Sequence, residues 1–172
     1  AQAYESPAEV LRKLNAVMSA EMRKDMFITL VYAVIDPAAN TLTLARAGHE
    51  LPLHLHRTSN GEFIAEPVGS EGMALGMVPC DIFDEVIQDV TIPFAAGESF
   101  LLYTDGVTET TNLDDEEYSS KRLRNLFKSL REERPERINQ EIFESLDHFK
   151  GDSQHIDDIT LVAVRRKSQQ ST

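Results

Sequence analysis

Two groups of aspartates stand at the ends of apolar segments, where a folded sheet could bring them together. Asp105 directly follows the apolar part of "FLLYTDGVTET" (residues 100–110), and Asp157 and Asp158 directly precede that of "HIDDITLVAV" (155–164). If the two segments form neighbouring antiparallel strands, the end of the first and the start of the second share one edge of the sheet. Carboxylates that converge there repel one another unless a cation or a proton lies between them.

Converging aspartates predict a particular metal chemistry. Carboxylate oxygens are hard ligands that suit Mg²⁺ or Mn²⁺, whereas zinc prefers histidine and cysteine. A pair of such ions can acidify a bound water and hold a phosphoryl group for in-line displacement. The alternative is structural, because the dipeptide Asp105-Gly106 is also a strong turn signal and often marks only the end of a strand. The aspartate pair before the second strand favours the metal site.

Composition sets limits on the fold and the partners. A chain of 172 residues fits one domain of the common size, about 50–250 residues, and we expect it to span 1–166 with a disordered polar tail at 167–172. The formal net charge of −12 argues against nucleic acid or an anionic membrane surface as a partner. Cys80 is the only cysteine, so no internal disulfide can form and a reducing, cytoplasmic location is expected.

Helical periodicity appears in two parts of the chain. Ser6–Glu9 reads as a capping box with proline at the first helical position, and the apolar spacing that follows predicts a helix over 7–22. The charged stretch 117–149 carries two apolar stripes at helical spacing, which predict two helices, the second starting at Pro135.

The remaining apolar segments are short and separated by turn residues, which predicts antiparallel strands. They are residues 26–36, 41–47, 51–56, 62–68, 85–92, 99–104 and 159–164. The first of them is apolar on both faces and is expected to be a central strand covered on both sides. Helices segregated from a run of strands give an α+β layered domain.

Several segments together resemble a known family. "GESFLLYTDGVTET" (97–110), followed after two helices by "DDITLVAV" (157–164), resembles the metal-dependent serine/threonine phosphatases of the PPM class, and most closely their bacterial SpoIIE/RsbU-like branch. "FITLVYAVIDPAANTLTLARAGHELPL" (27–53) is similar to the strand, hairpin and Ala-Gly-His segment of that branch, and "GMALGMVP" (72–79) to its Leu-Gly loop. The resemblance runs in unbroken order from about Ser6 to Val164.

The resemblance implies a sandwich of two mainly antiparallel β-sheets flanked by α-helices, with a binuclear Mn²⁺ or Mg²⁺ site at one edge. By position, Asp105 and Asp157 match metal ligands of the family, and Asp158 follows as a further ligand or as a support for the ligands. Gly106 would let the backbone pass close to the site. The family mechanism has a metal-bound water attack phosphoserine or phosphothreonine without a covalent enzyme intermediate.

One family feature has no counterpart in these residues. The resembled phosphatases carry an Asp-x-x-Gly-His-Gly-like segment whose aspartate bridges the two metals, and nothing in residues 1–172 matches it. Gly48-His49 is not a substitute, because no aspartate accompanies it and it falls in the hairpin region. The 172 residues alone are therefore expected to show little activity.

The resemblance also implies partners. The expected substrate is a phosphorylated regulatory protein, an anti-sigma-factor antagonist of the STAS type, with an upstream sensor or activator as a further partner. The alternative is a regulatory lobe without catalysis that binds a partner through the same sheet surface. The family pairs the helix at 7–22 with a preceding helix, so Leu11, Leu14 and Met18 are expected to lack partners here and to favour homodimer formation.

The histidines are weaker candidates. His49 is expected to hold the hairpin turn, with lining of the site as the alternative, and His155 either orients Asp157, meets the substrate or lies in a mobile loop. His54 and His56 alternate with leucines, so they share one face of a strand, and a solvated face is favoured over a metal site.

Overall fold

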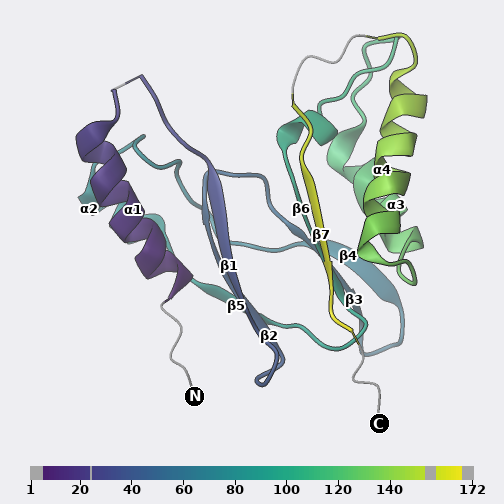
Figure 1. Cartoon of the computed structure of the whole chain (residues 1–172), viewed down its shortest axis with the longest axis horizontal. Coiled ribbons are helices and arrows are strands. Elements are labelled where there is room, and N and C mark those ends of the chain that lie inside the picture. The colour runs from purple at the N-terminus through teal and green to yellow at the C-terminus, as the bar shows by residue number, and fades with distance from the viewer. Residues whose placement is uncertain (1–5, 24, 154–157, 168–172) are drawn as a thin grey trace. The chain divides into compact units, whose positions relative to one another are not determined.

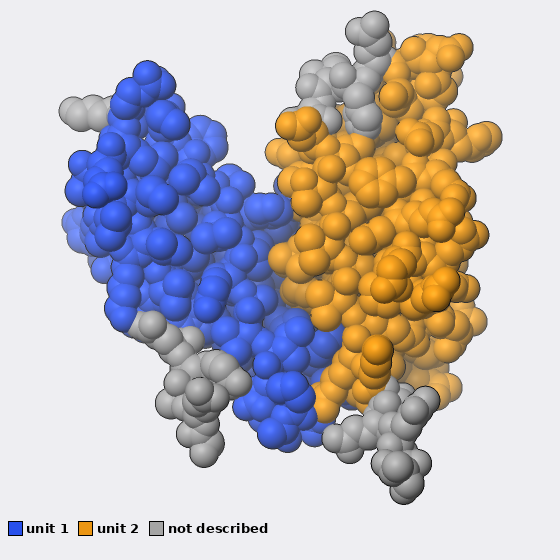
Figure 2. Space-filling model, in the orientation of Figure 1, with its two compact units in different colours: residues 1–51, 68–95 blue, residues 52–67, 96–172 orange. Residues whose placement is uncertain are grey.

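A computed structural model describes residues 6–23, 25–153 and 158–167. The chain divides into two compact units (Figure 2), unit 1 with Ala1–Leu51 and Val68–Ala95 and unit 2 with Pro52–Pro67 and Ala96–Thr172. The elements in chain order are α1 (Pro7–Glu21), β1 (Leu30–Asp36), β2 (Thr41–Ala47), β3 (Leu53–Arg57), β4 (Phe63–Pro67), α2 (Cys80–Val86), β5 (Val90–Pro93), β6 (Ser99–Tyr103), the 3₁₀ turn η1 (Asp105–Val107), α3 (Ser119–Ser129), α4 (Pro135–Lys150) and β7 (Leu161–Arg165).

Unit 1 is an antiparallel three-stranded sheet, in the order β1-β2-β5, with α1 and α2 packed beside it (Figure 1). Strand β2 has buried residues on both faces, since the neighbouring residues Leu44 and Ala45 are both buried and successive side chains of a strand point to opposite faces. Two of its buried side chains, Ala45 and Ala47, join those of the helices and of the loop before α2 in one apolar cluster: Ala8, Leu11, Ala45, Ala47, Leu75, Phe83 and Ile87.

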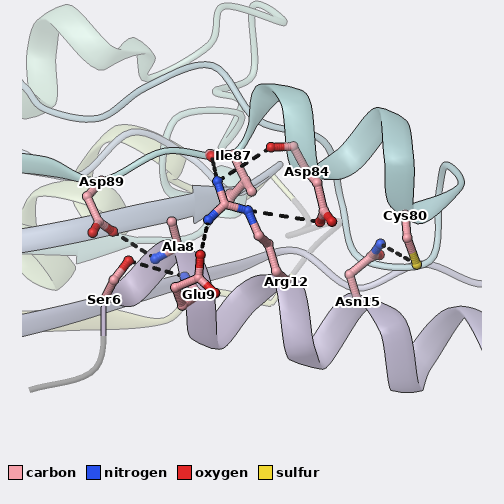
Figure 3. A network of polar contacts seen from close by, with 9 residues as sticks. All are labelled: Ser6, Ala8, Glu9, Arg12, Asn15, Cys80, Asp84, Ile87 and Asp89. Carbon is pink, nitrogen blue, oxygen red and sulfur yellow. Dashed lines mark hydrogen bonds and ion pairs between the residues drawn. The ribbon is translucent and has the colours of Figure 1, made fainter.

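Helix α1 is held to the rest of unit 1 by polar contacts (Figure 3) as well as by its apolar face. The Ala8 N–H donates to Asp89 Oδ1 (2.7 Å), and Arg12 Nη2 donates to the carbonyl oxygen of Ile87 (2.8 Å). Buried Asn15 accepts from the Gly76 N–H (2.9 Å) through Oδ1. The expectation that the helix lacks partners, and would therefore be poorly anchored, is wrong.

The apolar residues of α1 also have partners, contrary to the prediction. Leu11 is fully buried, and Leu14 packs against the cluster of unit 1. Val17 is the residue of the helix that leaves a large apolar surface open, at 54% exposed.

Unit 2 is an antiparallel four-stranded sheet in the order β4-β3-β6-β7, and α3 and α4 lie along one face of it (Figure 1). The helical stripes predicted from the sequence bury most of their apolar residues against that face, whereas Phe143 is 41% exposed. One cluster contains Leu53, Leu55, Ala65, Leu101 and Tyr103 of the sheet together with Leu123, Phe127, Ile138, Ile142 and Leu146 of the helices.

The predicted α+β class with two antiparallel sheets is confirmed. Two local predictions are wrong. Residues 80–86, at the boundary of the predicted strand 85–92, form helix α2, and the strand itself is shortened to β5. Strand β1 is not central, because it ends the order β1-β2-β5 and Tyr32 is 39% exposed. Among the described residues, no helix combines the length and the apolar character needed to span a membrane.

Candidate functional site

Asp105 lies where the sequence predicted, at the end of β6 beside the start of β7. The two strands pair antiparallel, with Tyr103 opposite Leu161, so the C-terminal end of β6 and the N-terminal end of β7 share one edge of the sheet. Thr104, the residue between β6 and Asp105, holds the two strands together at this edge. Thr104 donates through its N–H to the carbonyl oxygen of Thr160 (3.2 Å), and its Oγ1 accepts from the Thr160 N–H (2.9 Å).

The side chain of Asp105 is exposed and oriented by its own turn. Its Oδ1 accepts from the Gly106 N–H (3.0 Å), and its carbonyl oxygen accepts from the N–H groups of Thr108 and Glu109 (2.9 Å each), which closes the 3₁₀ turn η1. Its Oδ2 makes no hydrogen bond or ion pair with the described part of the chain. The carboxylate is therefore fixed at one oxygen and available at the other.

Gly106 brings the backbones of the two segments into contact. A Cβ atom at this position would lie 2.7 Å from the carbonyl oxygen of Asp158, closer than side chains tolerate. Thr104 Oγ1 donates to the same oxygen (3.0 Å). The segments that carry Asp105 and Asp158 are thus in direct contact at Gly106, and both aspartates are exposed.

Two predicted site residues, Asp157 and His155, lie outside the described residues. The prediction that Asp157 shares a cation with Asp105 therefore stays a prediction.

The candidate metal ligands at this edge are carboxylate oxygens, namely the free oxygen of Asp105 and those of Asp158. Carboxylate oxygens suit a hard divalent cation. Within residues 6–23, 25–153 and 158–167, no three His, Cys, Asp or Glu side chains are grouped closely enough to hold a metal ion. Asp105 and Asp158 would thus be part of a ligand set that needs further members. Asp157 is the predicted next one.

His49 belongs to unit 1, whereas Asp105 and Asp158 belong to unit 2. Its carbonyl oxygen accepts from Arg46 Nη1 (2.6 Å), and Arg46 Nε donates to the carbonyl oxygen of Ser70 (2.9 Å). Its ring Nδ1 lies 3.3 Å from the carbonyl oxygen of Glu50. His49 thus lies in the connection between β2 and β3, which belong to different sheets, and its predicted role stays a prediction.

His54 and His56 form a polar cluster with two glutamates. Their rings stack at 4.5 Å between centroids. His54 Nε2 lies 3.0 Å from Glu98 Oε2, and His56 Nε2 lies 2.8 Å from Glu66 Oε1. His54 is only 5% exposed, so the predicted solvated face is wrong for this residue. Burial lowers the pKa of His54, opposed by its hydrogen bond to Glu98.

The sequence could have suggested this cluster only through strand register. His54 pairs with Glu66 across β3 and β4, and Glu98 immediately precedes β6, the other neighbour of β3. Each histidine already has a carboxylate partner. We assign the cluster a structural role.

Residues 1–167 match the family described as Stage II sporulation protein E (SpoIIE). The chain belongs to the SpoIIE family. This family comprises PP2C-type, Mn²⁺- or Mg²⁺-dependent serine/threonine phosphatase domains related to RsbU and SpoIIE.

Two curated proteins are similar to the chain. It is 35% identical over 144 residues to Protein IcfG of Synechocystis sp. (strain ATCC 27184 / PCC 6803 / Kazusa), which covers 82% of the chain and 21% of IcfG. It is 28% identical over 161 residues to the phosphoserine phosphatase RsbU of Bacillus subtilis (strain 168), which covers 94% of the chain and 45% of RsbU. The chain thus spans less than half of either relative.

Solved structures show the same fold. The RsbU and RsbW domains of Rv1364c from Mycobacterium tuberculosis superpose with a TM-score of 0.75 at 21% identity, covering 97% of this chain and 44% of that chain. The phosphatase domain of SpoIIE from Bacillus subtilis (Mn presoaked) superposes with a TM-score of 0.67 at 16% identity, covering 100% of this chain and 79% of that chain. The α+β fold with two antiparallel sheets is that of PP2C phosphatase domains.

Proposed function

We propose that residues 1–166 act as one metal-dependent phosphatase domain that hydrolyses a phosphoserine or phosphothreonine of a regulatory protein. The observation that carries the proposal is the contact between the Asp105 and Asp158 segments at the joint edge of β6 and β7. The similarity to the phosphoserine phosphatase RsbU supports the reaction. The family resemblance supports a STAS-type anti-sigma-factor antagonist as the substrate.

The residues of this chain have separate roles in the proposal. The free oxygen of Asp105 binds a divalent cation, together with Asp157 and with Asp158 as ligand or support. Thr104 fixes the distance between the two strands, and Gly106 allows the backbones to touch. When bound, Mn²⁺ or Mg²⁺ supplies an acidified water and charge neutralisation at the phosphoryl group.

In the resembled family, a further aspartate from an Asp-x-x-Gly-His-Gly-like segment would help to hold the cations. Residues 1–172 contain no Asp-x-x-Gly-His-Gly segment. We therefore expect these residues alone to have low activity and a chain that carries such a segment upstream to be active, because one cation would otherwise be held weakly.

The test is a phosphatase assay of the full-length protein with Mn²⁺ or Mg²⁺, on p-nitrophenyl phosphate and on a serine-phosphorylated STAS protein. Metal-dependent release of phosphate from both is expected, with the phosphoprotein preferred. No release from either in the presence of either metal contradicts the enzyme assignment. Release of phosphate from p-nitrophenyl phosphate but not from the STAS protein would reject the proposed substrate and leave the phosphatase assignment in place. Equal activity of residues 1–172 and of the extended chain would reject the role given to the bridging segment.

A further inference from the structure

Helix α3 carries a concentration of positive charge that the proposed phosphatase chemistry does not use. The whole chain has 17 basic and 29 acidic residues, yet α3 contains four basic residues and no acidic one. Three of the four, Lys121, Arg124 and Lys128, recur at a spacing of three and four residues. Residues at this spacing lie on one face of a helix.

This face of α3 borders a pocket in unit 2. Lys121, Arg124, Asn125 and Lys128 line it from the helix, and Ile64 and Ala65 line it from β4. The pocket has a volume of about 270 Å³, and no carboxylate lines it. Strand β4 is at the end of the sheet order β4-β3-β6-β7, so the pocket lies along an edge of the sheet.

The charges on this face are not neutralised by the protein. Neither Lys121 nor Lys128 forms an ion pair or hydrogen bond with the residues that the structure describes, and both are exposed. The fourth basic residue of α3, Arg122, does have an acidic neighbour, Glu116, at 3.7 Å. The basic surface is therefore specific to the side of α3 that faces β4.

Arg124 is positioned for a ligand. Its Nε donates to the carbonyl oxygen of Ala65 (2.8 Å), which holds the guanidinium at the strand edge. Its terminal amino groups have no partner among the described residues. Arginine in this arrangement presents donors that fit a carboxylate in a bidentate geometry.

We propose that the α3–β4 surface, made of Lys121, Arg124, Asn125, Lys128, Ile64 and Ala65, binds an acidic polypeptide segment of a partner protein. The surface is longer than a single small anion, because Lys121 and Lys128 are two helical turns apart, about 10.5 Å. An acidic segment can place successive carboxylates along that length. Salt screens the interactions between exposed charges that are more than about 8–10 Å apart. A ligand at this surface therefore interacts more strongly with the nearby basic side chains than with the negative charges elsewhere on the chain.

Charge complementarity favours an acidic segment over the other occupants of this surface. A second copy of the chain is a weaker choice, because two chains of net charge −12 repel one another. The proposal concerns binding alone and does not rest on phosphatase activity.

The test measures binding of a fluorescein-labelled hexaglutamate peptide to the 172-residue chain by fluorescence anisotropy, with a hexaserine peptide as the uncharged probe. The variant is Lys121→Glu/Lys128→Glu, whose two side chains are exposed and make no contact that the fold needs. The control is Arg23→Glu/Lys167→Glu, which changes the net charge equally at exposed positions outside α3 and β4. Circular dichroism checks that both variants are folded.

The expected result is binding of hexaglutamate but not hexaserine, weakened at least tenfold by the α3 variant and less than threefold by the control. Amide shifts in an NMR titration should fall on Phe63–Pro67 and Ser119–Ser129. Equal weakening by both variants, shifts elsewhere, or no binding of hexaglutamate would overturn the proposal. Displacement of the peptide by inorganic phosphate at a lower concentration than by free hexaglutamate would also overturn it, in favour of a small-anion site.

Discussion

The backbone oxygen of Asp158 lies 2.7 Å from the point where Gly106 would carry a Cβ atom. The loop after β6 and the segment before β7 are thus in backbone contact, and the candidate ligands Asp105 and Asp158 project from these two pieces of chain. The arrangement of the candidate site therefore depends on the absence of a side chain at Gly106.

We predict that Gly106→Ala destabilises the protein by about 1–3 kcal/mol, because the added methyl group forces two backbone segments apart. The same shift should weaken Mn²⁺ binding by moving Asp105. Urea denaturation and a Mn²⁺-induced rise in melting temperature measure the two effects. Leu113→Ala, at a neighbouring loop residue that is 71% exposed, is the control and should change stability by less than about 0.5 kcal/mol. Wild-type stability and metal response in Gly106→Ala would show that the contact is not needed.

Asp105→Asn in the full-length protein should lower Mn²⁺-dependent phosphatase turnover about 100-fold or more, since even the supporting partners of metal ligands cost 10–100-fold when removed. The amide can still accept the hydrogen bond from the Gly106 N–H, so the turn should persist and the melting temperature without metal should stay unchanged. The rise in melting temperature on adding Mn²⁺ should shrink, because this rise reports binding to the native state.

Asp114→Asn is the matched control for that substitution. Asp114 is an exposed aspartate in the loop between η1 and α3, and its removal changes the net charge equally. It should leave both turnover and the metal response near the wild-type values. Full activity of Asp105→Asn would remove Asp105 from the ligand set.

Much of the fold could be predicted from local sequence patterns. The Ser6 cap and the following proline located α1, where Ser6 Oγ accepts from the Glu9 N–H (3.2 Å). Pro135 likewise marked the start of α4. Helix α2 was missed because its seven residues, CDIFDEV, are too few to show a helical period.

The partners of α1 could not be predicted, because they come from distant parts of the chain. Arg12 contacts Ile87, Asn15 contacts Gly76, and Ala8 contacts Asp89.

The candidate site and its surroundings likewise contain features that local sequence patterns predict and features that they do not. The order of apolar strands and aspartates predicted that Asp105 and the segment of Asp158 share an edge, whereas the pairing of His54 with Glu98 depends on the register of β3 and β6, which no local pattern fixes.

Leu11→Ala should destabilise unit 1 by about 2–5 kcal/mol, because Leu11 is fully buried in the cluster between α1 and the sheet. Val17→Ala on the same helix is the control, and its cost should stay below about 0.5 kcal/mol for the exposed side chain. Hydrogen exchange of the α1 amides should accelerate in the first variant and stay unchanged in the second. Equal, small effects of both would restore the idea of a poorly anchored α1.

The buried histidine of unit 2 predicts a pH dependence with a definite sign. Burial lowers the pKa of His54 below the value near 6.5 that it has in the unfolded chain. Between the two pKa values the unfolded state binds more protons than the folded state, so the free energy of unfolding rises with pH. The contribution of His54 is complete above about pH 6.5 and is lost as the pH falls through this window toward the folded-state pKa.

His54→Gln should therefore reduce the loss of stability between about pH 7.5 and 5.5, because glutamine does not titrate and its amide can still donate to Glu98. Urea denaturation at several pH values measures the slope. His148→Gln, an exposed histidine on α4, is the control and should keep the wild-type slope. A steeper slope in His54→Gln, or the same change in both variants, would contradict the assignment of this pH dependence to the buried ring.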